Sequence, residues 1–296
     1  MAQTIQKSLA HGKGTTSDGH QIEYVDTVEA YNKWAEVYDT DGNFLQALDT
    51  IEMRDLLPRF LARVQSQSQT ESADNTLAPL NLVDLGCGTG RNTLQLAKCA
   101  PSEARIIGLD ASPGMLEVAT TTLQEQRARA RASLPSPSAG RATLLGVYDL
   151  LSASSSSQPL PAPLQMQLAS GIISTLVLEH IPVDMFFEGA ARLIKPGGYF
   201  LVTNMHAEMG GISQAGFVDV KTGTKIRPTS YAHEVEDVVD AAERVGFEVV
   251  GLGDGEGERV RERRVDAAMV EGLGERGRKW VGVLVWFGVC FRMRSG

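Results

Sequence analysis

The stretch "NLVDLGCGTGRNTLQLA", residues 81 to 97, joins an apolar run to an amphipathic one through three closely spaced glycines. The apolar run is typical of a buried strand, and the residues after Gly90 have helical periodicity. Glycines at Gly86, Gly88 and Gly90 let the backbone turn sharply, and they let a ligand reach main-chain N–H groups without Cβ atoms in the way. The stretch therefore predicts a ligand site on a turn between a strand and a helix.

The spacing of the glycines indicates the class of ligand. The run reads D-x-G-x-G-x-G from Asp84, whereas the dinucleotide fingerprint G-x-G-x-x-G would place its third glycine where Arg91 stands. The turn is also not closed by the Lys-Ser or Lys-Thr pair that a phosphate-binding P-loop requires. The tight form that Asp84 opens favours a ligand with an ammonium group over one with a pyrophosphate.

Outside this stretch, short apolar runs alternate with longer amphipathic ones, which is typical of a doubly wound α/β fold with a mostly parallel sheet. We expect strands at 81–85, 105–109, 142–148, 169–175 and 198–204, with helices at 91–99, 113–131 and 183–194. The C-terminal part predicts a helix at 232–246, a strand at 247–253, a charged segment at 256–280 and a buried strand at 281–293. Three polar stretches are expected to be loops: 65–80, 133–140 and 152–165.

The N-terminal part predicts a disordered tail followed by a helical cap. Residues 1–20 are polar and aperiodic, and residues 21–65 read as two amphipathic helices separated by the turn "TDGN". Tyr31, Trp34 and Tyr38 recur at i, i+3 and i+7, so they are expected to share one helical face. Residues 80–296 then form the main domain.

Composition and charge narrow the classes of function. The 296 residues carry a formal net charge of -8, and this acidity disfavours a protein that grips nucleic-acid phosphates. Cys87, Cys99 and Cys290 have neither paired nor metal-ligand spacing, so we expect reduced structural thiols and no metal site. The N-terminus lacks the apolar stretch of a signal peptide and no run approaches a membrane span, which favours a soluble cytoplasmic protein, either a monomer or a homodimer.

The segment "VDLGCGTG" resembles the glycine motif of the class I S-adenosylmethionine-dependent methyltransferases. The resemblance extends from about Tyr31 to the C-terminus, with "IIGLDAS", "SPGMLEVA", "GVYDLL", "ISTLVLEHIP" and "LIKPGGYFLVT" at matching places. It implies a Rossmann-like sheet of seven strands with the last strand antiparallel, and a substrate-side insertion at about 207–232. It also implies S-adenosylmethionine as cofactor and S-adenosylhomocysteine as product.

The same resemblance implies roles for residues at the ends of the strands. Asp110 would accept hydrogen bonds from the ribose hydroxyls, Met115 would pack on the adenine, and Asp149 would lie beside the adenine amino group. Aromatic rings of the cap would contact the methionyl carboxylate and enclose the sulfonium, or else simply pack on the sheet. The expected cofactor contacts are Tyr31, Tyr38, Asp84, Gly86, Cys87, Gly88, Gly90, Asn92, Asp110, Ala111, Met115, Tyr148, Asp149, Leu150 and Ser174.

Methyl transfer from a sulfonium is an in-line displacement that needs positioning and no covalent residue. An oxygen or nitrogen acceptor must lose a proton, and histidine is the natural group to take it. His180 and His206 follow the fourth and fifth strands and are the two candidates, although each can also be a positioning or structural group. We expect transfer to an O or N atom of a small molecule, and the polar insertions resemble those of fungal methyltransferases of secondary metabolism.

Other functions remain open at this stage. A nucleic-acid methyltransferase acting on an exocyclic amine would show Asn or Asp before Pro-Pro-aromatic after the fourth strand, and "ISTLVLEHIP" lacks that pattern. A nicotinamide-dependent oxidoreductase is disfavoured by the glycine spacing. A protein methyltransferase, or a regulator that binds S-adenosylmethionine without catalysis, stays open because this chemistry has no obligatory catalytic residue.

Overall fold

The computed structural model describes residues 21–71, 79–133, 143–153, 159–252 and 259–295. Its main sheet has the order β10-β11-β6-β5-β2-β3-β4, with β9 also paired to β11. Strands β2 to β6 of this sheet run parallel, whereas β11 is antiparallel to β6, β9 and β10. The strands are β2 (Asn81–Leu85), β3 (Arg105–Asp110), β4 (Thr143–Val147), β5 (Ala169–Thr175), β6 (Ile194–Met205), β9 (Phe247–Val250), β10 (Val260–Arg264) and β11 (Leu284–Met293).

The predicted mostly parallel sheet with an antiparallel last strand is confirmed, but it has eight strands where seven were expected, because two strands share one edge position. Val250 of β9 pairs with Cys290 of β11, and Val260 of β10 pairs with the next residue back, Val289. Strands β9 and β10 therefore follow one another along the same edge of β11. The charged segment at 256–280 was not expected to contain a strand, because its alternating Arg and Glu carry no apolar face.

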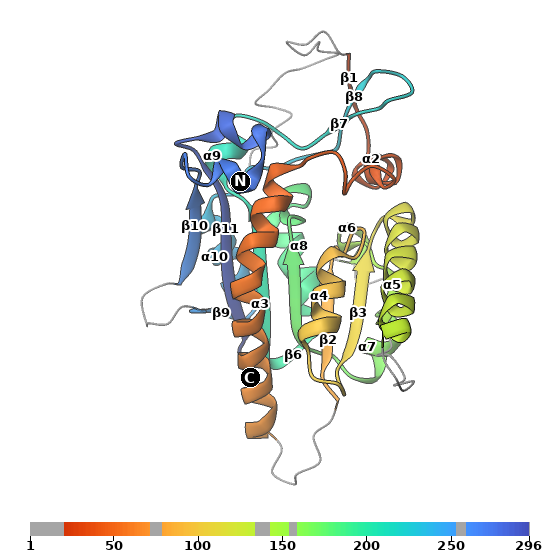
Figure 1. Ribbon diagram of the computed structural model, residues 1–296. Helices are drawn as coiled ribbons and strands as arrows, with labels where there is room; N and C mark the ends of the chain where they lie inside the picture. The colour runs from red at the N-terminus through yellow and green to blue at the C-terminus, as the bar shows by residue number, and fades with distance from the viewer. Residues whose placement is uncertain (1–20, 72–78, 134–142, 154–158, 253–258, 296) are drawn as a thin grey trace.

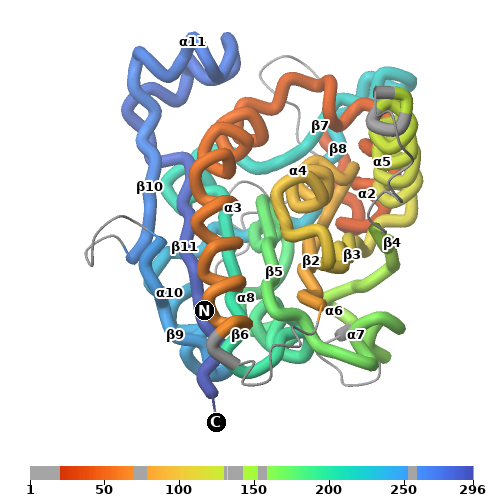
Figure 2. Tube along the Cα trace, turned by 60° about the horizontal axis from the view of Figure 1, so that its bottom comes forward, coloured from red at the N-terminus to blue at the C-terminus, as the bar shows by residue number. Residues whose placement is uncertain are grey.

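Helices cover both faces of the sheet (Figures 1 and 2). Side chains of successive strand residues point to opposite faces, so Leu82 joins the core under α3 and α4, whereas Val83 joins the core under α8 and α10. The longer helices are α3 (Phe44–Glu71), α4 (Arg91–Cys99), α5 (Pro113–Ser133), α8 (Val183–Ala191) and α10 (Val235–Arg244). The shorter ones are α6 (Leu150–Ala153), α7 (Ala162–Met166), α9 (Ala207–Gly210), α11 (Val270–Leu273), η1 (Leu178–His180) and η2 (Glu275–Trp280).

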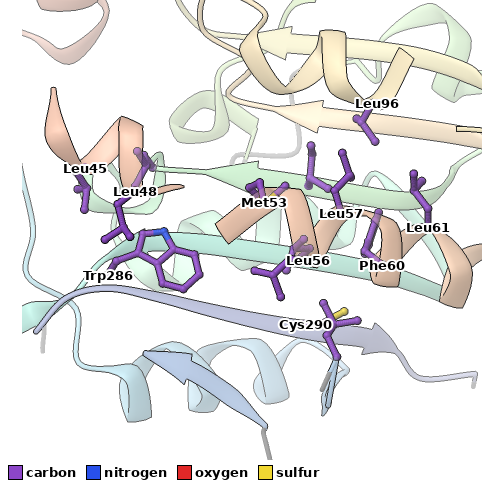
Figure 3. Close-up of a cluster of buried hydrophobic side chains, with 14 of the residues drawn as sticks. Leu45, Leu48, Met53, Leu56, Leu57, Phe60, Leu61, Leu96, Trp286 and Cys290 are labelled. Atoms are coloured by element: carbon purple, nitrogen blue, oxygen red, sulfur yellow. The ribbon is translucent and has the colours of Figure 1, made fainter. Parts of the chain in front are cut away.

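Helix α3 crosses one face of the sheet and supplies about a third of the buried residues of the core there (Figure 3). Leu48 and Phe60 of this helix are fully buried, and Trp286 of β11 packs in the same cluster. A buried acid fixes the register of this packing, because Asp49 accepts hydrogen bonds from Arg91 Nη2 at 2.6 Å, Thr203 Oγ1 at 2.6 Å and Trp286 Nε1 at 3.1 Å. Helix α3 is thereby joined to α4, β6 and β11.

The first part of the N-terminal cap and the insertion after β6 form one small unit beyond the carboxyl ends of the parallel strands (Figure 1). Strands β1 (Ile22–Tyr24) and β8 (Lys225–Arg227) pair in parallel, and β7 (Phe217–Val218) pairs with β8. Helix α2 (Thr27–Trp34) packs on this sheet, where Trp34 stacks on Phe217 with ring centroids 5.1 Å apart. The first part of the predicted cap, residues 22–38, thus shares a core with the insertion at 207–232. The second helix of the predicted cap, α3, packs on the main sheet instead.

Several expected boundaries need correction. Helix α3 continues to Glu71 through part of the polar stretch 65–80, and α7 begins inside 152–165 and ends one residue beyond it, because polar side chains on exposed helix faces are compatible with helix. Strand β6 begins at Ile194, so "KPGG" lies within the strand as an irregularity and not before it. The predicted tail 1–20 and most of 133–140 lie outside the described residues. Within the described part, no helix is long and apolar enough to cross a membrane.

Candidate functional site

A cavity lies where β2, β3, β4 and β5 end, and the cap covers it. Its walls are the glycine turn after β2, the residues after β3 and β4, the segment that leads from β5 through η1, and residues of α2 and the following turn. In open α/β sheets, ligands bind outside the carboxyl ends of the strands. The lining includes Tyr31, Tyr38, Gly86, Cys87, Gly88, Asn92, Asp110, Ala111, Met115, Tyr148, Asp149, Leu150 and His180.

The three glycines of the turn are required for three different reasons. A Cβ built on Gly86 would lie 2.2 Å from Cγ2 of Val177, so this position is cleared for packing against the segment after β5. Gly90 is the N-cap of α4 with φ +89°, and its added Cβ would meet Ala119 at 3.3 Å. Gly88 has φ +52° and no heavy atom within 4 Å of an added Cβ, so a side chain there would enter the open space of the cavity.

Asp110 holds the turn in place at the end of β3. Its Oδ2 accepts the backbone N–H of Gly88 at 2.8 Å, and its Oδ1 accepts the N–H of Ser112 at 2.8 Å. Burial raises the pKa of this carboxyl, while the N–H groups of Ser112 and Gly88 act in the opposite direction. The carboxylate is thus preorganised at the cavity wall, and each of its oxygens retains lone-pair capacity for a ligand hydroxyl.

The cap is tied to both ligand-binding loops by hydrogen bonds. Oδ1 of Asn32 accepts from the Ser112 hydroxyl at 2.8 Å and from the Gly114 N–H at 2.9 Å. Oδ1 of Asp39 accepts the Thr89 hydroxyl at 2.9 Å. Closing of the cavity by the cap is therefore coupled to the conformation of the loops below it.

His180 is fixed as the neutral tautomer that carries its proton on Nδ1. This nitrogen lies 2.8 Å from the carbonyl oxygen of Thr229, which can only accept, so Nδ1 donates. Nε2 then accepts the hydroxyl of Tyr31 at 2.7 Å. Burial lowers the pKa of His180 to about 4 and also raises the pKa of Tyr31, so both groups are uncharged at neutral pH. The pair forms a continuous hydrogen-bonded chain on the wall of the cavity.

The aromatic side chains of the cap lie together as predicted, although they do not all belong to one helix. Helix α2 ends at Trp34, so Tyr38 comes from the turn that follows it and not from the same helix. The ring of Tyr38 still lies 5.9 Å from that of Tyr31 and 5.1 Å from that of Trp34. Tyr31 and Tyr38 both line the cavity, whereas Trp34 faces the small sheet.

Three predicted cofactor residues are not part of the cavity wall. Asp84 is buried behind the turn, where its Oδ2 accepts the Thr93 hydroxyl at 2.6 Å and where burial raises its pKa to about 6. Ser174 points into the sheet and donates to the carbonyl of Leu85 at 2.8 Å. Gly90 serves the helix start described above. Side chains on a buried strand point toward the helices on one face of the sheet or on the other. Asp84 and Ser174 therefore contact neighbouring protein groups and not the cavity.

His206 is also remote from the cavity. Its Nδ1 accepts the N–H of Glu208 at the start of α9, which leaves Nε2 to donate to Oε1 of Glu262 at 3.2 Å. The structure therefore places this histidine at a helix cap. His233 lies two residues before the start of α10 and is buried, with Nε2 close to the carbonyl oxygens of Leu178 and Ile181.

Some lining residues were not expected from the sequence. Arg91 reaches the cavity wall while its guanidinium pairs with Asp49, a residue 42 positions away. Thr175 lines the cavity one residue after Ser174 and accepts the side-chain amide of Asn92 at 2.8 Å. Ser112 stands within the quoted motif "IIGLDAS", so a signal for it was present. No motif in the sequence pointed to Arg91 or Thr175, because the orientation of their side chains depends on partners that are distant in the chain.

The donor set of the cavity fits S-adenosylmethionine. Gly88 leaves space where a side chain would fill the turn, Asp110 offers carboxylate oxygens of the kind that bind a ribose diol, and Met115 is buried as an apolar wall. Tyr31 and Tyr38 supply aromatic faces, which attract a cation.

Comparison with known proteins gives the same family. The methyltransferase domain family matches residues 83–202. An uncharacterized methyltransferase of Emericella nidulans is 65% identical over 299 aligned positions, which cover 97% of this chain and 99% of that protein.

Solved structures of low sequence identity were also matched. A methyltransferase of Clostridium acetobutylicum is 14% identical, with a TM-score of 0.48 over 90% of this chain and 99% of that one. The magnesium protoporphyrin IX methyltransferase of Synechocystis, with bound S-adenosylhomocysteine, is 17% identical, with a TM-score of 0.47 over 90% of this chain and 94% of that one. From its cavity, its glycine turn and its close fungal relative, we conclude that the chain belongs to the class I S-adenosylmethionine-dependent methyltransferases.

Proposed function

We propose that the enzyme transfers the methyl group to an oxygen or nitrogen atom of a small-molecule acceptor, and that His180 takes the acceptor's proton through Tyr31. The observation that carries the proposal is the 2.7 Å hydrogen bond between the Tyr31 hydroxyl and Nε2 of His180 at the cavity wall. When bound, S-adenosylmethionine supplies the methyl group, and its C–S bond breaks as the bond from the acceptor atom to carbon forms.

The proton path needs no further group on the cavity side. As the acceptor atom loses its proton to the Tyr31 oxygen, the hydroxyl proton of Tyr31 passes to Nε2 of His180. The carbonyl of Thr229 holds the imidazole in the tautomer that leaves Nε2 free to accept. General-base assistance of this kind contributes about 10² to 10⁴ in rate.

A small acceptor is supported by the shape of the site. The cap encloses the cavity and is fastened to the loops by Asn32 and Asp39, so an acceptor must fit beneath α2. Apolar residues Leu150, Leu151, Val177 and Ile181 form part of the cavity wall. We propose no nucleic-acid substrate, since the net charge of -8 disfavours one.

The test is to incubate the protein with methyl-labelled S-adenosylmethionine and fractionated metabolite extract, and to identify the labelled product by mass spectrometry. With that product's precursor as acceptor, His180→Ala should lower kcat by about 10² or more while leaving cofactor affinity unchanged. His206→Ala is the matched control, because this histidine lies away from the cavity, and it should keep wild-type turnover.

Two results would contradict the proposal. Equal turnover of the His180→Ala variant and the wild type would remove the proton path. Tight cofactor binding without any labelled product, across fractions of small molecules, protein and nucleic acid, would favour a regulator that binds the cofactor without catalysis.

The wider biological setting stays a prediction. We propose a fungal enzyme of secondary metabolism that acts in the cytoplasm. The fungal assignment is supported by the 65% identical relative from Emericella nidulans. Comparing the metabolites of a deletion strain with those of its parent would test the pathway class, since a missing methylated product is expected.

A further inference from the structure

A buried carboxyl lies directly behind His180 and has no role in the mechanism above. Glu179 belongs to η1, the turn that follows β5, and only 5% of its surface is exposed. Its Oε1 lies 3.6 Å from Nε2 of His180. Its Oε2 is buried without a hydrogen-bond partner among the described residues. Burying a carboxyl in this way is costly, so its persistence needs a reason.

Among the described residues, the groups that act on Glu179 come from several elements, and no cation is among those that shift its pKa. Burial raises the pKa of this carboxyl to about 7, the backbone N–H of Met205 acts against that shift, and the negative charge of Asp49 adds to it. Tyr31 and Tyr38 also lie within its electrostatic reach. Asp49 is itself compensated by Arg91.

The interaction between His180 and Glu179 depends on whether Nε2 of His180 carries a proton. With Nδ1 committed to Thr229, a neutral His180 presents a lone pair at Nε2, which already accepts from Tyr31. In this state an ionised Glu179 cannot accept a hydrogen bond from Nε2, because Nε2 carries no proton. Once a proton reaches Nε2, the same carboxylate faces an imidazolium at ion-pair distance.

We infer that Glu179 is a positioning carboxylate that makes His180 an effective proton acceptor during methyl transfer. The inference rests on the proposed function for its catalytic consequence. The acceptor's proton moves to the Tyr31 oxygen, and the Tyr31 proton moves to Nε2. The positive charge that then forms on His180 is balanced by the negative charge on Glu179, so no net charge is created in the buried site. His180 alone is a weak base there, because burial disfavours its charged form.

A purely structural role accounts for less of the geometry. The backbone of Glu179 already holds the turn, since its N–H donates to Oδ1 of Asn204 at 3.3 Å and its carbonyl accepts the N–H of Tyr231 at 2.7 Å. These contacts need no carboxylate. A glutamine or a leucine at this position would satisfy the backbone equally well.

The first test needs neither cofactor nor acceptor. Protein labelled with ¹⁵N-histidine is titrated by NMR from pH 5.5 to 8.5, and the His180 signals are assigned by their loss in His180→Gln. In the wild type, we expect the His180 ring nitrogens to shift in a step near pH 7, as the pair loses its shared proton. E179Q should abolish that step.

Glu262→Gln is the matched control, because Glu262 pairs with a different buried histidine, His206. It should leave the His180 step in place. A wild-type titration with no step, or a step that survives in E179Q, would overturn the inference. The absence of a step in the wild type would overturn the inference even if E179Q does not fold.

The second test uses the acceptor found by isotope labelling. E179Q should lower kcat on the order of tenfold or more with little change in cofactor Kd, and it should remove the acidic limb of the kcat profile near pH 7. E179D should restore part of kcat. A kcat profile with the same acidic limb in E179Q would also refute the inference. Failure of the labelling experiment would sink the proposed function, whereas failure of the NMR titration would sink this inference alone.

Discussion

Replacing Asp110 with alanine removes the carboxylate on which the cofactor site depends. In the structure, this side chain already accepts two backbone hydrogen bonds of 2.8 Å, from Gly88 and Ser112. A bound ribose would add hydrogen bonds from its hydroxyls to the same oxygens. Each charge-assisted hydrogen bond contributes about 1.5 to 3 kcal/mol.

The expected loss of cofactor affinity follows from these contacts. Losing one such bond to the ribose weakens binding by about 1.5 to 3 kcal/mol, which is roughly 10- to 150-fold in Kd. The variant also leaves the N–H groups of Gly88 and Ser112 without their acceptor, so the glycine turn loses rigidity and we expect a further loss of about 1 to 3 kcal/mol in unfolding free energy. Asp110→Asn keeps the size and one acceptor oxygen, so its effects should be smaller.

Isothermal titration calorimetry with S-adenosylhomocysteine measures the Kd, and urea denaturation measures the stability. Asp184→Ala is a suitable control, since this exposed carboxylate on α8 pairs with Arg244 and does not line the cavity. If Asp110→Ala binds within twofold of the wild type, Asp110 does not hold the ribose and the reasoning fails.

Two further predictions concern stability. Asp49→Ala should cost about 3 to 5 kcal/mol in unfolding free energy, because it leaves the half-buried Arg91 without its carboxylate and the buried Thr203 and Trp286 without their acceptor; a loss below 1 kcal/mol in urea would contradict this. As pH rises, the free energy of unfolding of the wild type should fall relative to that of Glu179→Gln. The reason is that folding raises the pKa of Glu179 from 4.5 to about 7, so the folded state holds an extra proton between these pH values. The wild type therefore loses about 3 kcal/mol relative to the variant from pH 4.5 to 7, and parallel urea curves for both proteins across that range would refute it.

Much of the fold follows from local patterns in the chain. Four of the five expected strands of the parallel sheet match within a residue or two, because apolar runs of that length and spacing have few other ways to be buried. Strand β6 was the exception, since "KPGG" resembles a turn and the irregular start of the strand depends on pairing with β5. The split edge formed by β9 and β10 was also missed, because only β11 supplies the partner for residues 260–264.

The site was predictable where a residue's role depends on its immediate neighbours. The glycine turn and the acid after β3 are such cases, since backbone conformation and position at a strand end are written in short motifs. The role of the other site candidates depends on which side chains, often distant in the sequence, lie against them in the folded protein. Asp84 turned toward Thr93, and His206 became a helix cap, although both stand at strand ends in the sequence.

By itself, the sequence determined the family, the α/β architecture and the cofactor turn, because these depend on residue spacing and on the conformational freedom of glycine. Only the tertiary structure decided which histidine faces the cavity, and that it is joined to Tyr31 and backed by Glu179. Tyr31 and His180 are 149 residues apart, and their contact exists because the cap folds back over the strand ends. Burial then sets the charge of each group, since desolvation depends on everything packed around it and not on the neighbours in the chain.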